Sequence, residues 1–221
     1  MASVADWSRH QGYNYHCIGD KLFDWVTPGL RAKLHDRKPI LSDLARLRWI
    51  ESELAVRGGL VVWIDADTLV VDPTWHMPDW THTFFGEECW VQRTAEGAWR
   101  AFQSPHNAFM GFTAASPVLG FLVYLSESII ERADAAHIAP QMVGPKLLKA
   151  LNNLAQFTLV PEAGAVSPEL LAEWVGEAGP AAACYEQAAR APLALVNLCS
   201  SLTQSEEAVQ RVGQFLARHG A

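Results

Sequence analysis

The stretch that decides the fold is "SDLARLRWIESELAVRGGLVVWIDADTLVVDP", residues 42–73. Apolar residues at helical spacing lead to the glycine pair 58–59, and five apolar residues, 60–64, follow at once. A glycine pair is typical of a helix end, and an unbroken apolar run of this length is typical of a strand covered on both faces. The pattern predicts a helix with Leu41 or Ser42 near its N-cap, a tight turn and a buried strand.

Outside this stretch, further strand-like and helix-like segments alternate without internal repeats. The predicted strands are at 13–18, 82–87, 107–114, 157–161 and 193–197, and the predicted helices are at 117–133, 144–154 and 205–220, while residues 163–192 show no clear pattern. With 221 residues, half of them hydrophobic, the chain can bury one substantial core. The alternation predicts a single α/β domain with helices on both faces of a sheet.

Composition excludes several classes of partner. The net charge of −7 and the absence of a Lys/Arg cluster argue against nucleic acid. No apolar run is long enough to span a membrane, and residues 1–15 do not resemble a signal peptide, so we expect a soluble protein in the cytoplasm. The scattered cysteines, without a CxxC pair, are expected to be buried thiols; they are Cys17, Cys89, Cys184 and Cys199.

Asp65 and Asp67 directly follow the predicted strand 60–64. In open α/β sheets, ligands bind beyond the carboxyl ends of strands, and two carboxylates at i and i+2 point to the same side once the chain turns. Such oxygen ligands suit a Mg²⁺ or Mn²⁺ ion that also binds phosphate, as in a nucleotide diphosphate. The alternative is a solvated turn in which the aspartates only cap the backbone.

The helix before this strand places charge on its apolar stripe. Asp43 shares the i, i+4, i+7, i+11 spacing with Leu47, Ile50 and Leu54, and Arg46 lies beside it. An unpaired buried charge is costly, so charges on an inward face indicate a site. The alternative is that Asp43 and Arg46 merely pair with each other at i, i+3 spacing.

Together these residues resemble the DXD glycosyltransferases of the GT-A fold, and most closely glycosyltransferase family 32. The matching pattern is Ser42-Asp43 with Arg46, the glycine pair, the strand, Asp65-Ala66-Asp67, and Asp72-Pro73. Weaker similarity continues through "HNAFMGFTAASPVLGFL", residues 106–122, and "MVGPKLL", residues 142–148. The resemblance implies a GT-A-like, Rossmann-like mixed sheet, with residues 1–115 binding the nucleotide sugar and 116–221 forming the acceptor side and C-terminal part.

The resemblance also implies a function and a set of site residues. A divalent Mn²⁺ or Mg²⁺ ion on Asp67 and Asp65 would hold the diphosphate of a nucleotide-sugar donor. Ser42, Asp43 and Arg46 would bind the donor, with Asp65 also reaching its ribose or sugar. A hexose would pass to a glycan or glycolipid acceptor, with retention of configuration. Asn107 and Gly144 would line the acceptor side, and the inner membrane face, where lipid-linked glycans are assembled, is a further candidate location.

The chain departs from the family pattern at two places. The family begins with a strand of the type Ile-Pro-Lys-x-Ile-His-Gln-x-Trp that builds the floor of the base pocket, and this first strand is missing here. Near the end, Asn197 stands where the family often has a metal-binding His. An amide oxygen can bind the same ions without adding charge, or Asn197 can be a strand-end residue with no ligand role.

Three other interpretations stay open. A degenerate transferase would be a sugar-binding or partner-binding module without activity. A haloacid dehalogenase-like phosphatase fits less well, because Thr68 comes one position too early for its motif. The aromatic cluster after the DXD strand would be either a sugar platform or core, and the histidines near candidate loops show no ligand spacing; these residues are Trp75, Trp80, Trp90, Trp99, His76, His82 and His106.

Overall fold

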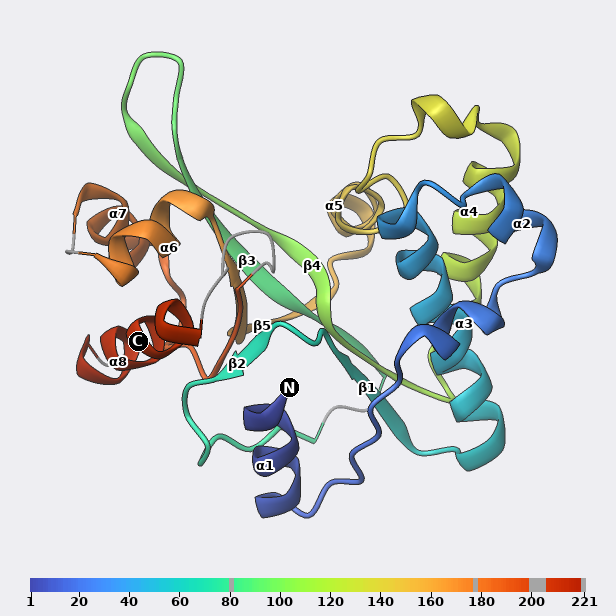
Figure 1. Cartoon of the computed structure of the whole chain (residues 1–221), viewed down its shortest axis with the longest axis horizontal. Helices are drawn as coiled ribbons and strands as arrows, with labels where there is room; N and C mark the ends of the chain where they lie inside the picture. Colours follow the sequence, from blue (N-terminus) through green and yellow to red (C-terminus); the bar gives the residue numbers. More distant parts are fainter. Residues whose placement is uncertain (80–81, 177–178, 199–205, 220–221) are drawn as a thin grey trace.

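The structure is a computed structural model that describes residues 1–79, 82–176, 179–198 and 206–219. Its centre is a six-stranded mixed sheet in the order β1-β4-β3-β5-β6-β2 (Figure 1). The strands are β1 (Leu60–Ile64), β2 (Thr68–Val70), β3 (Thr83–Arg93), β4 (Trp99–Thr113), β5 (Thr158–Val166) and β6 (Leu195–Asn197). The predicted α/β class, a mixed sheet flanked by helices, is confirmed.

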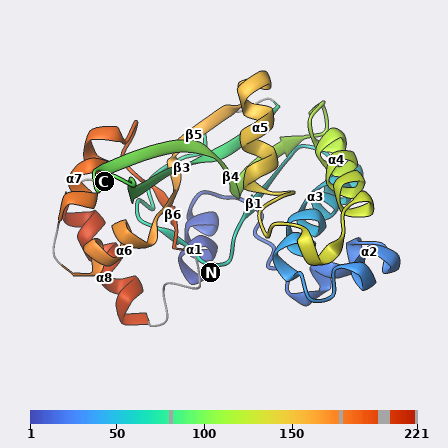
Figure 2. The same ribbon diagram turned by 90° about the horizontal axis from the view of Figure 1, so that it is seen from above.

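Helices gather at the two ends of this sheet. Figures 1 and 2 show α2, α3 and α4 near β1, and α6, α7 and α8 at the opposite end, while α1 lies beneath the middle. The α-helices are α1 (Ala2–His10), α2 (Pro28–Lys33), α3 (Lys38–Arg57), α4 (Leu119–Arg132), α5 (Pro145–Ala155), α6 (Pro168–Val175), α7 (Pro180–Ala188) and α8 (Glu206–His219), with short 3-10 helices at Asp20–Trp25 and Ala135–His137. Among the described residues, none of these helices has the length and apolar character needed to cross a bilayer.

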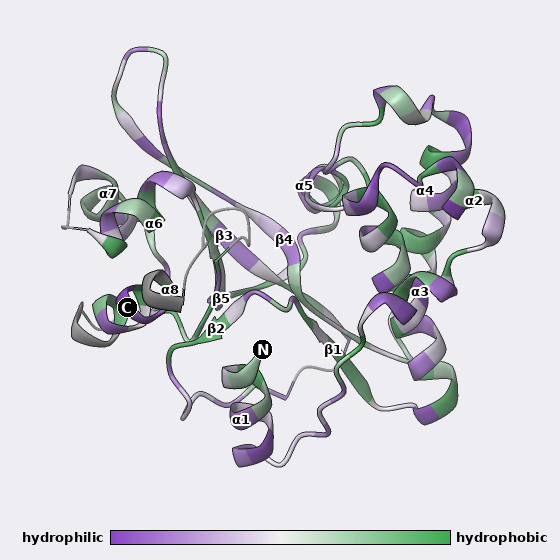
Figure 3. Ribbon diagram, viewed as in Figure 1, coloured by the Kyte–Doolittle hydropathy of each residue, from purple (hydrophilic) through white to green (hydrophobic). Residues whose placement is uncertain are grey.

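Three clusters of buried apolar side chains hold these layers together. The first joins α3 and α4 to the β1 end of the sheet, with Ile50 and Leu122 at its centre. The second packs α6, α7 and α8 under the β3–β4 hairpin, and the third places Trp7 of α1 against Phe84 and Phe109. Figure 3 shows β1 largely in the hydrophobic colour, as its sequence requires. The site lies where the first and third clusters meet.

The predicted helix start is wrong by a few residues. α3 begins at Lys38, because Pro39 occupies a first-turn position where its missing N–H costs nothing, so Ser42 lies inside the helix. Its end is as predicted: Gly58 has φ 64° and ψ −158°, a conformation essentially limited to glycine. The apolar stripe is also confirmed, since Asp43, Leu47, Ile50 and Leu54 are all buried.

Strand β1 is confirmed, but its predicted burial on both faces is wrong. It is an edge strand that pairs only with β4, and its residues are exposed or half-buried. The predicted strand 13–18 is absent, since residues 13–19 have no regular structure. This segment lines the cavity together with β1 and forms no ladder with that edge strand.

The hairpin and the later elements differ in extent from the sequence prediction. β3 and β4 continue well beyond 82–87 and 107–114, and their hairpin projects from the body in Figure 1, because Val91, Trp99 and Ala101 pack on the second cluster. Helix α4 begins two residues after Pro117. The unreadable stretch 163–192 holds the end of β5, α6 and α7.

The expectation for the cysteines is correct only in part. Cys89 is buried, Cys184 is half-buried and Cys17 is exposed. Cys17 lies in the irregular segment 13–19, which lines an open cavity and therefore leaves the thiol uncovered. Cys199 lies outside the described residues.

Candidate functional site

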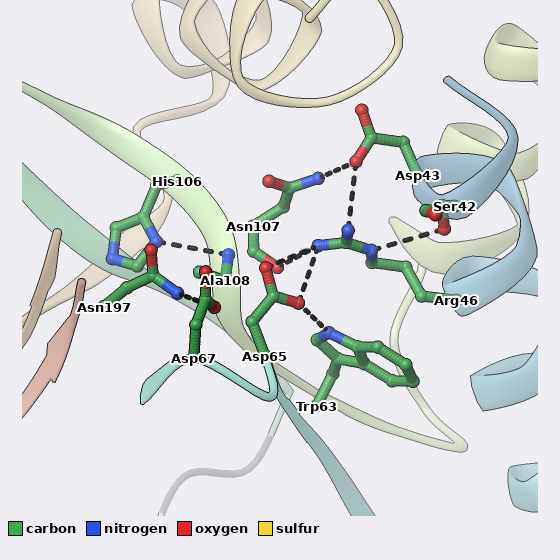
Figure 4. Close-up of polar contacts among 10 residues, drawn as sticks. All are labelled: Ser42, Asp43, Arg46, Trp63, Asp65, Asp67, His106, Asn107, Ala108 and Asn197. Atoms are coloured by element: carbon green, nitrogen blue, oxygen red, sulfur yellow. Dashed lines mark hydrogen bonds and ion pairs between the residues drawn. The ribbon is translucent and has the colours of Figure 1, made fainter. Parts of the chain in front are cut away.

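The DXD residues form a turn that joins β1 to β2. Asp65 continues the ladder by donating its backbone N–H to Ala108 O at 2.8 Å, and the N–H of Thr68 closes the turn on Asp65 O at 3.1 Å. The chain then enters β2, which pairs with β6. Figure 4 shows the carboxylates of Asp65 and Asp67 pointing to the same side of this turn, as expected for i and i+2 residues.

The Asp65 carboxylate is fixed from two sides. Trp63 donates its indole Nε1–H to Asp65 Oδ1 at 2.5 Å, and Arg46 Nη1 lies 3.1 Å from the same oxygen. The Asp65 side chain remains 26% exposed. It can therefore still accept a hydrogen bond from a bound molecule.

Asp67 is held by the strand at the far end of the chain. Asn197 donates its amide Nδ2 to Asp67 Oδ1 at 2.7 Å, and Leu198 donates its backbone N–H to Asp67 O at 3.1 Å. The predicted metal ligand Asn197 is thus beside Asp67. In this structure its amide nitrogen, which cannot bind a cation, faces the carboxylate, so Asn197 orients Asp67.

Arg46 and its neighbours from α3 complete the site. Arg46 donates Nε–H to the carbonyl of Ser42 at 3.3 Å and Nη1–H to the carbonyl of Asn107 at 2.9 Å, while Nη2 lies 3.3 Å from Asp43 Oδ1. Ser42 contributes its backbone carbonyl to these contacts. The helix and β4 therefore converge on Asp65 through one guanidinium.

Asp43 lies at the buried end of this network. Its Oδ1 also accepts a hydrogen bond from Asn107 Nδ2 at 2.8 Å. Burial raises the pKa of Asp43 to about 6, outweighing Arg46 and the Asn107 hydrogen bond, which both lower it. Gly144 packs over the other oxygen, since a Cβ there would lie 2.4 Å from Asp43 Oδ2. The predicted acceptor-side residues Asn107 and Gly144 thus contact a predicted donor-side residue.

A cavity of about 900 Å³ opens beside β1, within the size range of ligand pockets. Its lining comes from β1, the irregular segment 13–18 and parts of α1 and α3, together with Asp65 and Ala66 of the turn. The lining includes the aromatic residues Trp7, Tyr13, Tyr15, Trp49 and Trp63, and the ring centroids of Trp49 and Trp63 lie 5.7 Å apart in an edge-to-face contact. A flat aromatic ligand next to Asp65 is the kind of molecule that such walls can hold.

One residue of the site, Trp63, was not predicted from the sequence, and a second, His106, was among the histidines that show no ligand spacing. Trp63 could have been found, because the two-residue period of a strand places it on the same side as Asp65. His106 lies beside Asn107 on β4 and is fully surrounded by protein, which lowers its pKa by desolvation. Its Nδ1 accepts the N–H of Ala108 at 3.2 Å and its Nε2 is 3.0 Å from Ala163 O, so the neutral Nε2–H form fits.

His106 therefore joins β4 to β5 directly behind the DXD turn, and no sequence pattern marks it. Gly86 makes room for the ring, since a Cβ there would lie 2.3 Å from His106 Nε2. Gly86 pairs with His106 at the point where the register of β3 against β4 shifts, between Phe85 and Gly86.

The other residues singled out lie away from this network. Trp75 stacks on Trp7 in the third cluster, and Trp90 and Trp99 lie on the hairpin, while Trp80 lies outside the described residues. In the described part of the chain, no three His, Cys, Asp or Glu side chains are grouped so that they could hold a metal without further ligands. Comparison with protein-family models, with curated proteins and with solved structures found no match to this chain.

Proposed function

We propose that this chain is a metal-dependent glycosyltransferase that moves a hexose from a nucleotide-diphosphate sugar to a glycan or glycolipid acceptor. The observation that carries the proposal is the position of Asp65 and Asp67. Their carboxylates point to the same side of one turn, and Asp65 and Ala66 of that turn line a cavity of about 900 Å³. A nucleoside in the cavity would place its diphosphate at this turn.

The residues present fit a hard divalent cation such as Mn²⁺ or Mg²⁺. Such ions use one or two carboxylates together with phosphate oxygens and water, so two aspartates are sufficient. Asp67 is the better ligand of the pair, because Arg46 already neutralises much of the charge on Asp65. When bound, the cation would stabilise the negative charge that develops on the departing diphosphate.

The residues of the chain then have separate tasks. Asp65, fixed by Trp63 and Arg46, would accept hydrogen bonds from hydroxyl groups of the donor. Trp49 and Trp63 would cover the base and keep water away from it. A retaining outcome stays part of the proposal through the family resemblance, with attack by the acceptor hydroxyl on the face that the diphosphate leaves.

A binding module without activity is the second candidate. It is favoured by the internal use of Arg46 and Asp43, which are 8% and 7% exposed and leave little contact surface for a donor. Such a module would bind a sugar or a nucleotide and leave the glycosidic bond intact. Only the glycosyltransferase would turn over a sugar nucleotide.

The test measures metal-dependent hydrolysis of a set of sugar nucleotides by the wild type and by Asp67→Ala. We expect the wild type to release nucleoside diphosphate only with Mn²⁺ or Mg²⁺, and the variant to lose at least about a hundredfold in rate, since it lacks the metal carboxylate. Asp79→Ala, an exposed aspartate outside the site, is the matched control. Normal turnover by Asp67→Ala would refute the assignment, and binding without turnover by the wild type would favour the module.

A further inference from the structure

We propose that Arg46 is a positioning residue, which fixes the Asp65 carboxylate and does not bind the donor itself. The inference rests on the proposed function and specifies how its site is built. The family resemblance assigns this arginine to donor contact. The geometry indicates instead that its guanidinium contacts groups of the protein.

Most hydrogen-bond donors of Arg46 already have acceptors within the protein. A guanidinium has five N–H groups. In this structure Nε, Nη1 and Nη2 already reach the Ser42 carbonyl, the Asn107 carbonyl, Asp65 and Asp43 (Figure 4). At most two N–H groups are left, both on Nη2, so the paired contact that an arginine makes with a phosphate through two nitrogens has no free edge.

The Arg46 guanidinium is also poorly accessible to a bound molecule. The Arg46 side chain is only 10% exposed, and the ring of Trp63 lies 5.5 Å from its central carbon. Little of the guanidinium surface is therefore left for a donor to contact. Asp65, with 26% of its side chain exposed, is the group that faces outward.

The contacts of Arg46 also form a closed ring. Arg46 binds Asp43 and the carbonyl of Asn107, and the side-chain amide of Asn107 binds Asp43 in turn. Gly144 covers Asp43 from above. The ring anchors one side of the guanidinium to α3 and β4, so its other side presents a fixed pair of contacts to Asp65.

Two readouts test the inference, and the first needs no enzymatic activity. The indole N–H resonance of Trp63, identified with Trp63→Phe, reports on the hydrogen bond to Asp65. We expect Arg46→Met to shift this resonance, and to shift it much less in the Asp65→Asn background, because the guanidinium also lies over the Trp63 ring and only the part that depends on the carboxylate reports on Asp65. Arg48→Met is the matched control on the same helix, since Arg48 pairs with Glu51 and Glu127 on the surface. An unchanged Trp63 resonance in Arg46→Met would overturn the inference.

The second readout is a double-mutant cycle on sugar-nucleotide hydrolysis. We expect Arg46→Met to lower the rate about tenfold to a hundredfold, in line with the loss of a residue that orients a ligand-binding group. In the Asp65→Asn background the same substitution should change the rate by less than about twofold, because its effect passes through Asp65. Losses that multiply in the double variant would show that Arg46 touches the donor, and would contradict the inference.

A conservative variant covers the case in which Arg46→Met does not fold. Arg46→Lys keeps a charge for the buried carboxylates but cannot make all four contacts. We expect Arg46→Lys to shift the Trp63 resonance. Wild-type values for both the resonance and the hydrolysis rate would contradict the positioning role of Arg46. A wild-type protein that hydrolyses no sugar nucleotide would refute the proposed function, while the Trp63 resonance would still decide the role of Arg46.

Discussion

At the scale of single residues, Asp43 links the site to the stability of the fold. Burial raises its pKa from 3.8 to about 6, so between these values the folded chain binds more protons than the unfolded chain. The free energy of unfolding contributed by Asp43 is therefore fully present below about pH 4 and falls as the pH rises to about 6. The size follows from a shift of about two pKa units, which is roughly 3 kcal/mol.

The prediction concerns the difference in unfolding free energy between the wild type and Asp43→Asn. Between pH 4 and pH 7 this difference should change by about 2 to 3 kcal/mol, with the wild type losing stability relative to the variant, because Asn cannot ionise. Urea unfolding at both pH values measures it, and all other titrating groups cancel in the comparison. A difference that stays constant with pH would show that Asp43 has an ordinary pKa.

At the scale of elements, the sequence predicts a helix or strand best where short-range spacing alone decides the structure. The apolar stripe of α3, the glycine stop at 58 and 59 and the apolar strand β1 all follow from short-range spacing, and the structure has them. The segment 13–18 has strand composition but lines the cavity without joining the edge strand β1, and the hairpin packs on the cluster that holds residues of α6, α7 and α8. Such outcomes depend on contacts between distant segments, so local patterns cannot predict them.

The stop of α3 gives a test at this scale, measured as the urea-derived free energy of unfolding. Gly58→Ala should lower it by about 1 to 3 kcal/mol, because φ 64° with ψ −158° is strained for any residue with a Cβ. Gly120→Ala is the matched control: it lies exposed in α4 with ordinary φ and nothing near its Cβ position, and should raise stability by about 0.5 to 1 kcal/mol. Equal effects at the two positions would contradict the account of this helix end.

At the scale of the whole molecule, the site exists because the sheet brings together residues from three distant parts of the chain. Asp67 meets Asn197 across 130 positions, and Arg46 meets Asn107 across 61. The residue types could be selected from the sequence through motif resemblance, and all of them lie near the DXD turn. The separate roles of these residues could not be predicted from the sequence, because the hydrogen bonds of Arg46 and the orientation of Asn197 depend on side-chain geometry.

The edge position of β1 is the second property of the whole molecule. Strand β1 pairs with β4 on one edge only, and residues 60–66 line the cavity. The central claim is therefore that a cation and a nucleoside diphosphate bind together at this edge.

The most direct test is a titration with Mn²⁺, followed by the side-chain N–H resonances of tryptophan and asparagine, in the presence of uridine, guanosine, cytidine or adenosine diphosphate. A paramagnetic ion at Asp67 should broaden the resonances of Asn197 and Trp63 before that of Trp174, which lies in the second cluster. At least one diphosphate should strengthen the effect. Broadening that is uniform over all tryptophans, or is absent at both Asn197 and Trp63, would contradict the account.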